Sequence, residues 1–183
     1  MRVVVLGAMT GHKGIYFLRD CMSAWKNAGL LIDVTIIGEI LFAEAIEDVE
    51  VTGRYDQTEL PRLIADVDPH LIFYPQRCPE TYSYTLSEGR MAGAPLLAPD
   101  LGAFRERVQG GEWCWLYDPA SDPDELTKLI HSIRYAHIEK NIPPSVLPRQ
   151  STIDPYDVSR FFYEKDYLYE TLSAPISSNK EAS

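Results

Sequence analysis

The sequence lacks the features that would place it in a membrane or in an oxidising compartment. None of its apolar runs reaches the roughly 18 residues of a membrane-spanning helix, so we expect no transmembrane segment. The apolar start at Arg2–Gly7 is too short for a secretory signal and leads straight into a glycine-rich loop. Three cysteines occur, without CxxC spacing. They predict neither a disulfide framework nor a zinc site, and they favour a reducing, cytoplasmic setting.

Positive charge is scarce as well. The 183 residues contain 17 Lys and Arg against 27 Asp and Glu, which gives a net charge of −10. A general nucleic-acid-binding surface needs a basic footprint, so this class of function is excluded. The remaining composition, with 45% hydrophobic and 24% charged residues, is that of an ordinary globular chain of one domain with at most an appendage.

Several short motifs of enzymes are missing too. The glycine-rich loop Gly7–Gly14 has neither the GxGxxG nor the Walker A spacing, and no GxSxG nucleophile elbow occurs. His131 and His137 are six residues apart on a predicted helix, which does not put them on one face as metal ligands. We therefore expect no metal site.

What the sequence does contain is a regular alternation of apolar strands with amphipathic helices. Strands are predicted at 3–6, 31–38, 49–53, 70–75, 95–98 and 113–117, and helices at 15–28, 57–67, 84–92, 104–108 and 122–139, with a weak one at 43–50. This order predicts a three-layer, doubly wound parallel α/β sheet of Rossmann-like type over residues 1–140. Residues 141–172 are predicted to be a connector and a C-terminal helix, and 173–183 a disordered tail.

Ligands of such sheets bind beyond the carboxyl ends of the strands, so the loops there hold the candidate sites. The loop after the first strand places Lys13 beside the start of a helix. Its glycines allow close backbone approach, and a helix N-terminus with a nearby cation attracts anions. By itself, this loop is equally consistent with a tight turn and with a phosphate cradle.

Two glutamates frame the second candidate, Glu80 in a loop and Glu88 within the following helix. Eight residues of helix rise about 12 Å, so the two carboxylates cannot act as a close pair. They would instead contact different parts of one extended ligand, with a Ser- and Thr-rich helix start between them that suits a phosphate. The alternative is that Glu80 favours the helix dipole and Glu88 is a surface residue.

Together, these segments resemble the C-terminal, donor-binding domain of retaining GT-B glycosyltransferases of family 4 (glycosyltransferase group 1). The resemblance covers about residues 2–140, and its most specific part is the Glu-x7-Glu spacing. The segments that carry it are Val5–Ala8, His12–Gly14, Thr52–Tyr55, Glu80–Glu88, Ala92–Pro95, Asp100–Ala103, Glu106–Val108 and Trp115–Pro119.

The resemblance implies a role for each candidate residue. Lys13 would neutralise the diphosphate of a nucleotide sugar, which Gly7 would let approach the backbone, and Glu80 would lie beside the donor sugar. Lys13 and Glu80 would thus be the catalytic residues, without a metal ion or other cofactor. Glu88 would accept hydrogen bonds from the ribose. The other donor-binding residues would be Gly53, Arg54 and Tyr55 near the nucleobase, and Thr81, Tyr82 and Ser83, whose amides would reach the sugar or the distal phosphate.

Two departures from the family accompany this resemblance. Many relatives carry an arginine just after the first strand, where this chain has Ala8 and Met9. The N-terminal, acceptor-binding half of a GT-B enzyme is missing, so we expect it elsewhere in a parent chain or in a partner. The alternatives are a non-catalytic nucleotide-sugar-binding module, half of a GT-B sugar-nucleotide epimerase, and a Rossmann-like protein that acts through interactions.

Overall fold

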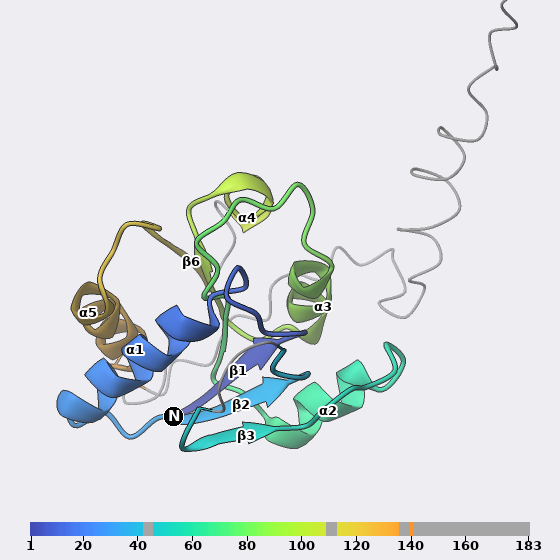
Figure 1. Ribbon diagram of the computed structural model, residues 1–183, viewed down its shortest axis with the longest axis horizontal. Helices are drawn as coiled ribbons and strands as arrows, with labels where there is room; N and C mark the ends of the chain where they lie inside the picture. The colour runs from blue at the N-terminus through green and yellow to red at the C-terminus, as the bar shows by residue number, and fades with distance from the viewer. Residues whose placement is uncertain (42–45, 109–112, 136–139, 141–183) are drawn as a thin grey trace, which may run out of the picture. The chain divides into compact units, whose positions relative to one another are not determined.

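A six-stranded parallel sheet forms the middle layer of the described part of the chain, with helices on both of its faces (Figure 1). The structure is a computed structural model that describes residues 1–41, 46–108, 113–135 and 140. The predicted connector, C-terminal helix and tail (141–183) lie outside these residues, as does the end of the helix predicted at 122–139. Within the described residues, no helix is long and apolar enough to cross a membrane.

The sheet has the strand order β3-β2-β1-β4-β5-β6, with every neighbouring pair parallel. This order confirms the predicted doubly wound, Rossmann-like sheet. The chain builds outward from β1 through β2 to β3, then crosses back to the other side of β1 and builds through β4 to β6. The strands are β1 (Arg2–Leu6), β2 (Asp33–Ile37), β3 (Val49–Val51), β4 (Leu71–Phe73), β5 (Leu96–Pro99) and β6 (Cys114–Tyr117).

Helices cover both faces of the sheet because its central strands are apolar on both sides. Side chains of β1 alternate, so that Val3 and Val5 join one core cluster and Val4 and Leu6 join another. Helices α1 (Ile15–Asn27) and α5 (Pro123–Arg134) cover the first cluster and lie side by side in Figure 1. The second cluster is covered by α2 (Leu60–Val67), α3 (Tyr84–Ala92) and α4 (Gly102–Val108).

Two predicted helices differ from the structure. The helix predicted at 57–67 begins only at Leu60, because Pro61 cannot donate to the carbonyl of Gln57 and its ring would clash there. The weak helix predicted at 43–50 is wrong for residues 46–50, while 42–45 lie outside the described residues. Asp48 has φ 60°, which interrupts a helix, and Val49 instead begins β3.

The sheet topology brings two loops together at one edge. Strands β1 and β4 are parallel neighbours, and the chain winds in opposite directions on either side of them. The loop after β1 (7–14) and the loop after β4 (74–83) therefore leave the same edge of the sheet side by side. In open α/β sheets, this switch point is where ligands bind.

Candidate functional site

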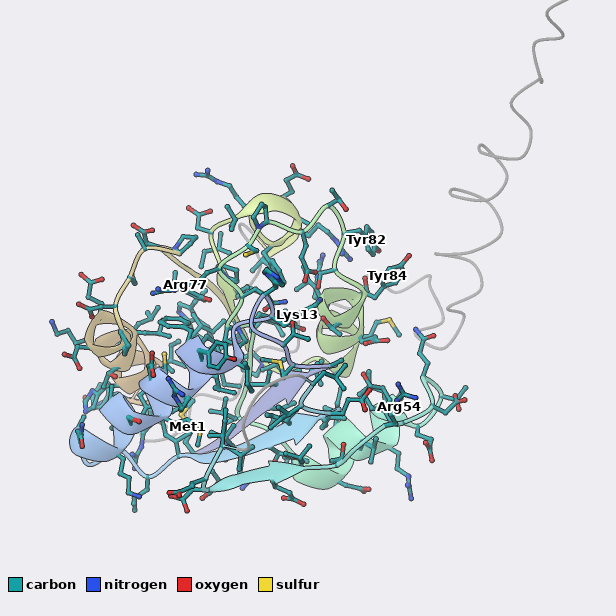
Figure 2. All side chains as sticks on the ribbon, viewed as in Figure 1. Met1, Lys13, Arg54, Arg77, Tyr82 and Tyr84 are labelled. Carbon is teal, nitrogen blue, oxygen red and sulfur yellow. The ribbon has the colours of Figure 1, made fainter. Side chains whose placement is uncertain are left out.

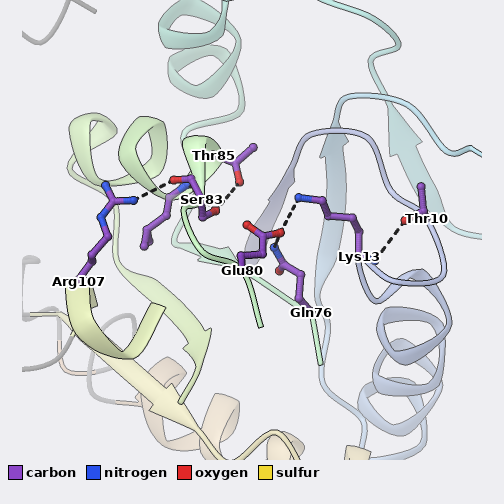
Figure 3. A network of polar contacts seen from close by, with 8 residues as sticks. Thr10, Lys13, Gln76, Glu80, Ser83, Thr85 and Arg107 are labelled. Atoms are coloured by element: carbon purple, nitrogen blue, oxygen red, sulfur yellow. Dashed lines mark hydrogen bonds and ion pairs between the residues drawn. The ribbon is translucent and has the colours of Figure 1, made fainter. Parts of the chain in front are cut away.

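An ion pair joins the two loops at the switch point. Nζ of Lys13, from the loop after β1, lies 2.6 Å from Oε1 of Glu80, from the loop after β4 (Figure 3). The Glu80 side chain is 17% exposed and that of Lys13 is 42% exposed, so this pair is partly shielded from water. The structure thus brings together the two residues for which the family resemblance implies a catalytic role, although 67 positions separate them.

Glycines allow these loops to pack closely against their neighbours. Gly14, the N-cap of α1, has φ 82°, and a Cβ there would lie 2.1 Å from the carbonyl oxygen of Pro75. A Cβ on Gly7 would lie 3.1 Å from Cγ2 of Thr85 in the first turn of α3. Because Gly14 carries no side chain, α1 begins without a side-chain cap directly after Lys13. This combination of a cation and an uncapped helix start favours an anion.

The first turn of α3 is held by its own polar side chains. Ser83 is the N-cap, and its Oγ accepts a hydrogen bond of 3.3 Å from the amide of Leu86. The hydroxyls of Tyr82 and Ser87 lie 3.1 Å apart. Tyr82 and Tyr84 are both partly exposed, and Figure 2 shows them together at the start of α3. The remaining candidate of this segment, Thr81, is exposed.

Glu88 forms a second polar group with residues that precede α2. Its Oε1 accepts a hydrogen bond of 3.1 Å from Nε2 of Gln57. Burial raises the pKa of Glu88, while the bond from Gln57 acts in the opposite direction. Nearby, burial and then the charge of Glu88 raise the pKa of Tyr55 to about 12. The structure therefore places Tyr55 and Glu88 in one neighbourhood, as one ligand spanning both would require.

The other two residues proposed to lie near a nucleobase serve different contacts. Gly53 has φ 82°, and its amide donates to the carbonyl of Gly38 at 2.8 Å. Arg54 is largely exposed and forms a 3.0 Å ion pair with Glu39, at the end of β2. In Figure 2, Arg54 lies on the side of α2, apart from Lys13. In this structure, the Arg54 guanidinium thus serves Glu39 and does not join the Lys13–Glu80 pair.

Three residues in contact with the candidate site were not predicted. Gln76 is 4% exposed, and its Nε2 lies 3.4 Å from Oε1 of Glu80, while its own Oε1 is buried with no hydrogen-bond partner among the described residues. Gln57 contacts Glu88, and Arg107 of α4 contacts the start of α3. The position of Gln76 just after a predicted strand was a usable signal. No local pattern pointed to Gln57, and Arg107 entered only as part of the segment Glu106–Val108, without a role of its own.

A cavity of about 290 Å³ opens on the α1 side of the Lys13 loop. Its lining includes His12 and Gly14, on either side of Lys13 in the chain, together with Phe17 and Arg77. The guanidinium of Arg77 stacks 3.8 Å from the centre of the Phe17 ring and donates to the carbonyl of Ser121. Across the described ranges, no group of three or more His, Cys, Asp or Glu side chains is arranged to hold a metal ion.

Comparison with known proteins supports the fold through structure and not through sequence. No protein-family model matches the chain, and no curated protein matches it. A crystal structure of Anabaena Alr3699/HepE in complex with UDP-glucose is 20% identical with a TM-score of 0.58, covering 78% of this chain and 41% of that one. The apo form of the lipopolysaccharide outer core galactosyltransferase WaaB is 18% identical with a TM-score of 0.60, covering 86% and 45%.

A third similar structure consists of one domain. It is the C-terminal domain of a glycosyl transferase group 1 family protein (LpcC) from Francisella tularensis, 14% identical with a TM-score of 0.56, covering 73% of this chain and 78% of that one. At these identities the likeness establishes the fold. The chain has the Rossmann-like α/β fold of GT-B glycosyltransferase C-terminal domains, and it spans less than half the length of HepE and WaaB.

Proposed function

We propose that this chain is the donor-binding domain of a retaining glycosyltransferase and that it binds a nucleoside diphosphate sugar. The contact between Lys13 and Glu80 carries the proposal. In such a donor the sugar is bonded directly to the distal phosphate. The residue that binds the phosphate and the residue that contacts the sugar must therefore be neighbours in the structure. Lys13 and Glu80 meet this requirement at the switch point of the sheet.

The charges of the pair suit an anionic ligand. An ammonium group offers three N–H donors, of which the bond to Glu80 takes one, so Lys13 can bind a phosphate without leaving Glu80. The start of α1 adds its dipole on the same side of the loop. Because the whole chain carries a net charge of −10, a diphosphate would depend on this local positive site.

Glu88 and Tyr55 would take the nucleoside end of the ligand. The ribose lies on the far side of the diphosphate from the sugar, which calls for a second polar group separate from Lys13 and Glu80. Glu88, bonded to Gln57 and close to Tyr55, supplies acceptors there for ribose hydroxyls. The likeness to HepE, whose structure was solved with UDP-glucose, supports a ligand of this class.

Catalysis in this proposal is electrostatic. Negative charge develops on the departing nucleoside diphosphate, and Lys13 with the start of α1 would stabilise it without a metal ion. The acceptor would be held by an N-terminal half in the same parent chain or in a partner, since this chain covers 41% of HepE and 45% of WaaB. Cys21, Cys78 and Cys114 are free thiols, which supports a cytoplasmic setting.

Calorimetric titration with UDP, GDP and ADP tests the proposal. We expect one of the three to bind the wild-type chain, and Lys13→Ala and Glu88→Ala to weaken that binding by about tenfold or more, the effect of losing one hydrogen bond to a charged group. Lys26→Ala is the matched control. Lys26 also forms an ion pair, at 3.2 Å with Asp48, but it lies in the last turn of α1, at the opposite end of the helix from Lys13.

The outcomes separate the candidate functions. Binding that is lost in both variants and retained in Lys26→Ala supports the site. Absence of binding by the wild-type chain favours a Rossmann-like protein that acts through interactions. Binding that Lys13→Ala and Glu88→Ala leave unchanged would place the ligand somewhere else on the chain.

A further inference from the structure

Helix α4 lies against the segment that carries the proposed sugar-binding residues. At its start, the amide of Ala103 donates to the carbonyl oxygen of Glu80 at 3.0 Å. The contact is close, because a Cβ on Gly102 would lie 2.8 Å from that same oxygen. The backbone at Glu80 is therefore fixed by the first residues of α4, which follow β5 and belong to a different part of the sequence.

At the other end of α4, Arg107 contacts the start of α3. Its Nη1 donates to the carbonyl of Ser83 at 3.0 Å (Figure 3). Its Nη2 donates to Oγ of Ser87 at 2.6 Å. The guanidinium also lies 4.3 Å from the centre of the Tyr82 ring. A planar guanidinium can make these two hydrogen bonds and one stacking contact at once, whereas an ammonium cannot reproduce this geometry.

A second arginine joins the same two helices, with the donor on α3 and the acceptor on α4. Nη1 of Arg90, near the end of α3, donates to the carbonyl of Arg107 at 2.9 Å. Each helix thus sends one guanidinium to the backbone of the other. Burial lowers the pKa of Arg107, which indicates that its guanidinium is partly desolvated where it makes these contacts.

We propose that Arg107 is a positioning residue for the ligand. By holding Tyr82, Ser83 and Ser87 it keeps the start of α3 in the conformation that faces the distal phosphate and sugar. The role rests on the proposed function, because the ligand it serves is the nucleoside diphosphate of that proposal. Arg107 would act on the ligand through the residues 82–87 that it contacts.

Four forms of the full chain test this role: wild type, Arg107→Met, Arg107→Lys and Arg105→Met. Arg105→Met is the matched control, since it removes the same charge from the same helix and breaks a 3.1 Å ion pair with Asp100 in place of the contacts to α3. The probes are UDP, GDP and ADP in calorimetric titrations. Hydrogen exchange of peptides spanning 80–90 is measured on the same samples without ligand.

We expect Arg107→Met to lower diphosphate affinity by about tenfold, because two charge-assisted hydrogen bonds that hold the segment are lost. Arg107→Lys should recover part of this loss, and Arg105→Met should bind like the wild type. Faster hydrogen exchange in Arg107→Met should be confined to 80–90, whereas a general loss of structure would also raise exchange in β1 and α1. Ser87→Ala removes the acceptor of the Arg107 Nη2 bond together with the hydroxyl contact to Tyr82, and keeps the bond from Arg107 to the carbonyl of Ser83. It gives a milder version of the same result if Arg107→Met does not fold.

The outcomes distinguish this role from the function on which it rests. If the wild-type chain binds none of the three diphosphates, the proposed function is wrong and the ligand role of Arg107 falls with it. If the wild type binds, and Arg107→Met binds equally tightly with unchanged exchange at 80–90, the role of Arg107 alone is refuted. Equal losses in Arg107→Met and Arg105→Met would refute it too, because general charge would then explain the effect.

Discussion

The contact between Gly89 and Tyr74 controls how closely α3 lies against the sheet. A Cβ on Gly89 would lie 2.1 Å from the hydroxyl oxygen of Tyr74. That hydroxyl donates to the carbonyl of Thr85 at 2.8 Å, and the Tyr74 side chain is almost fully buried. We therefore predict that Gly89→Ala destabilises the protein, although alanine is the better helix former.

The magnitude follows from opposing contributions. Replacing glycine by alanine inside a helix gains about 1 kcal/mol from propensity. Against this, overpacking a buried contact costs about 1–3 kcal/mol, and displacing a buried hydroxyl from its acceptor costs about 1–3 kcal/mol more. The two costs together come to about 2–6 kcal/mol, so the expected net loss in the free energy of unfolding for Gly89→Ala is roughly 1–5 kcal/mol.

A double-mutant cycle in urea unfolding provides the assay. In a Tyr74→Phe background the hydroxyl is gone, and the nearest atom of the ring to a Cβ at position 89 is Cζ at 3.4 Å, an ordinary contact. Gly89→Ala should then be neutral or stabilising, so the two substitutions are coupled by about 2 kcal/mol or more. The close approach of α3 to β4 would be refuted if Gly89→Ala raised the stability of the otherwise wild-type protein, or if the cycle showed no coupling between the two substitutions.

Two further predictions concern the same edge of the sheet. Gly14→Ala should lower the free energy of unfolding by about 2–4 kcal/mol, because the cost of a left-handed backbone and the cost of an overlap with the Pro75 carbonyl add together. Gly29 also has a left-handed backbone, with φ 72°, but open space surrounds its Cβ position. Gly29→Ala should therefore lower the free energy of unfolding by only about 1–2 kcal/mol. Urea midpoints compare the two, and equal losses would contradict the overlap. Glu88→Gln should stabilise the chain at pH 7: burial raises the pKa of Glu88, so the wild type loses stability as pH rises from about 4.5 through that raised pKa. Unfolding measured across pH should show this advantage vanish below about pH 4.5, and an advantage that persists there would contradict burial as its cause.

Local sequence patterns were sufficient for most of the fold. Runs such as Val3–Leu6 are apolar and mostly β-branched at successive positions, which is typical of a strand buried on both faces of a parallel sheet. The helices predicted to begin at residues 84 and 122 begin within one residue of those positions, α3 after its N-cap Ser83 and α5 after its N-cap Asp122. The two helix predictions that differ from the structure lie where the backbone of a single residue outweighs the helical pattern of its neighbours, at Pro61 and at Asp48.

For the candidate site, local patterns were enough to name the candidate side chains and to assign them to one edge of the sheet. It placed Lys13 and Glu80 in loops after strands, because periodicity and turn residues act over a few positions. Only the tertiary structure decided that these two residues bond to each other, that Gln57 bonds to Glu88, and that Arg107 holds the start of α3. The physical reason is that such contacts depend on which strands become neighbours, and the pairing of β1 with β4 is decided by the packing of the whole sheet.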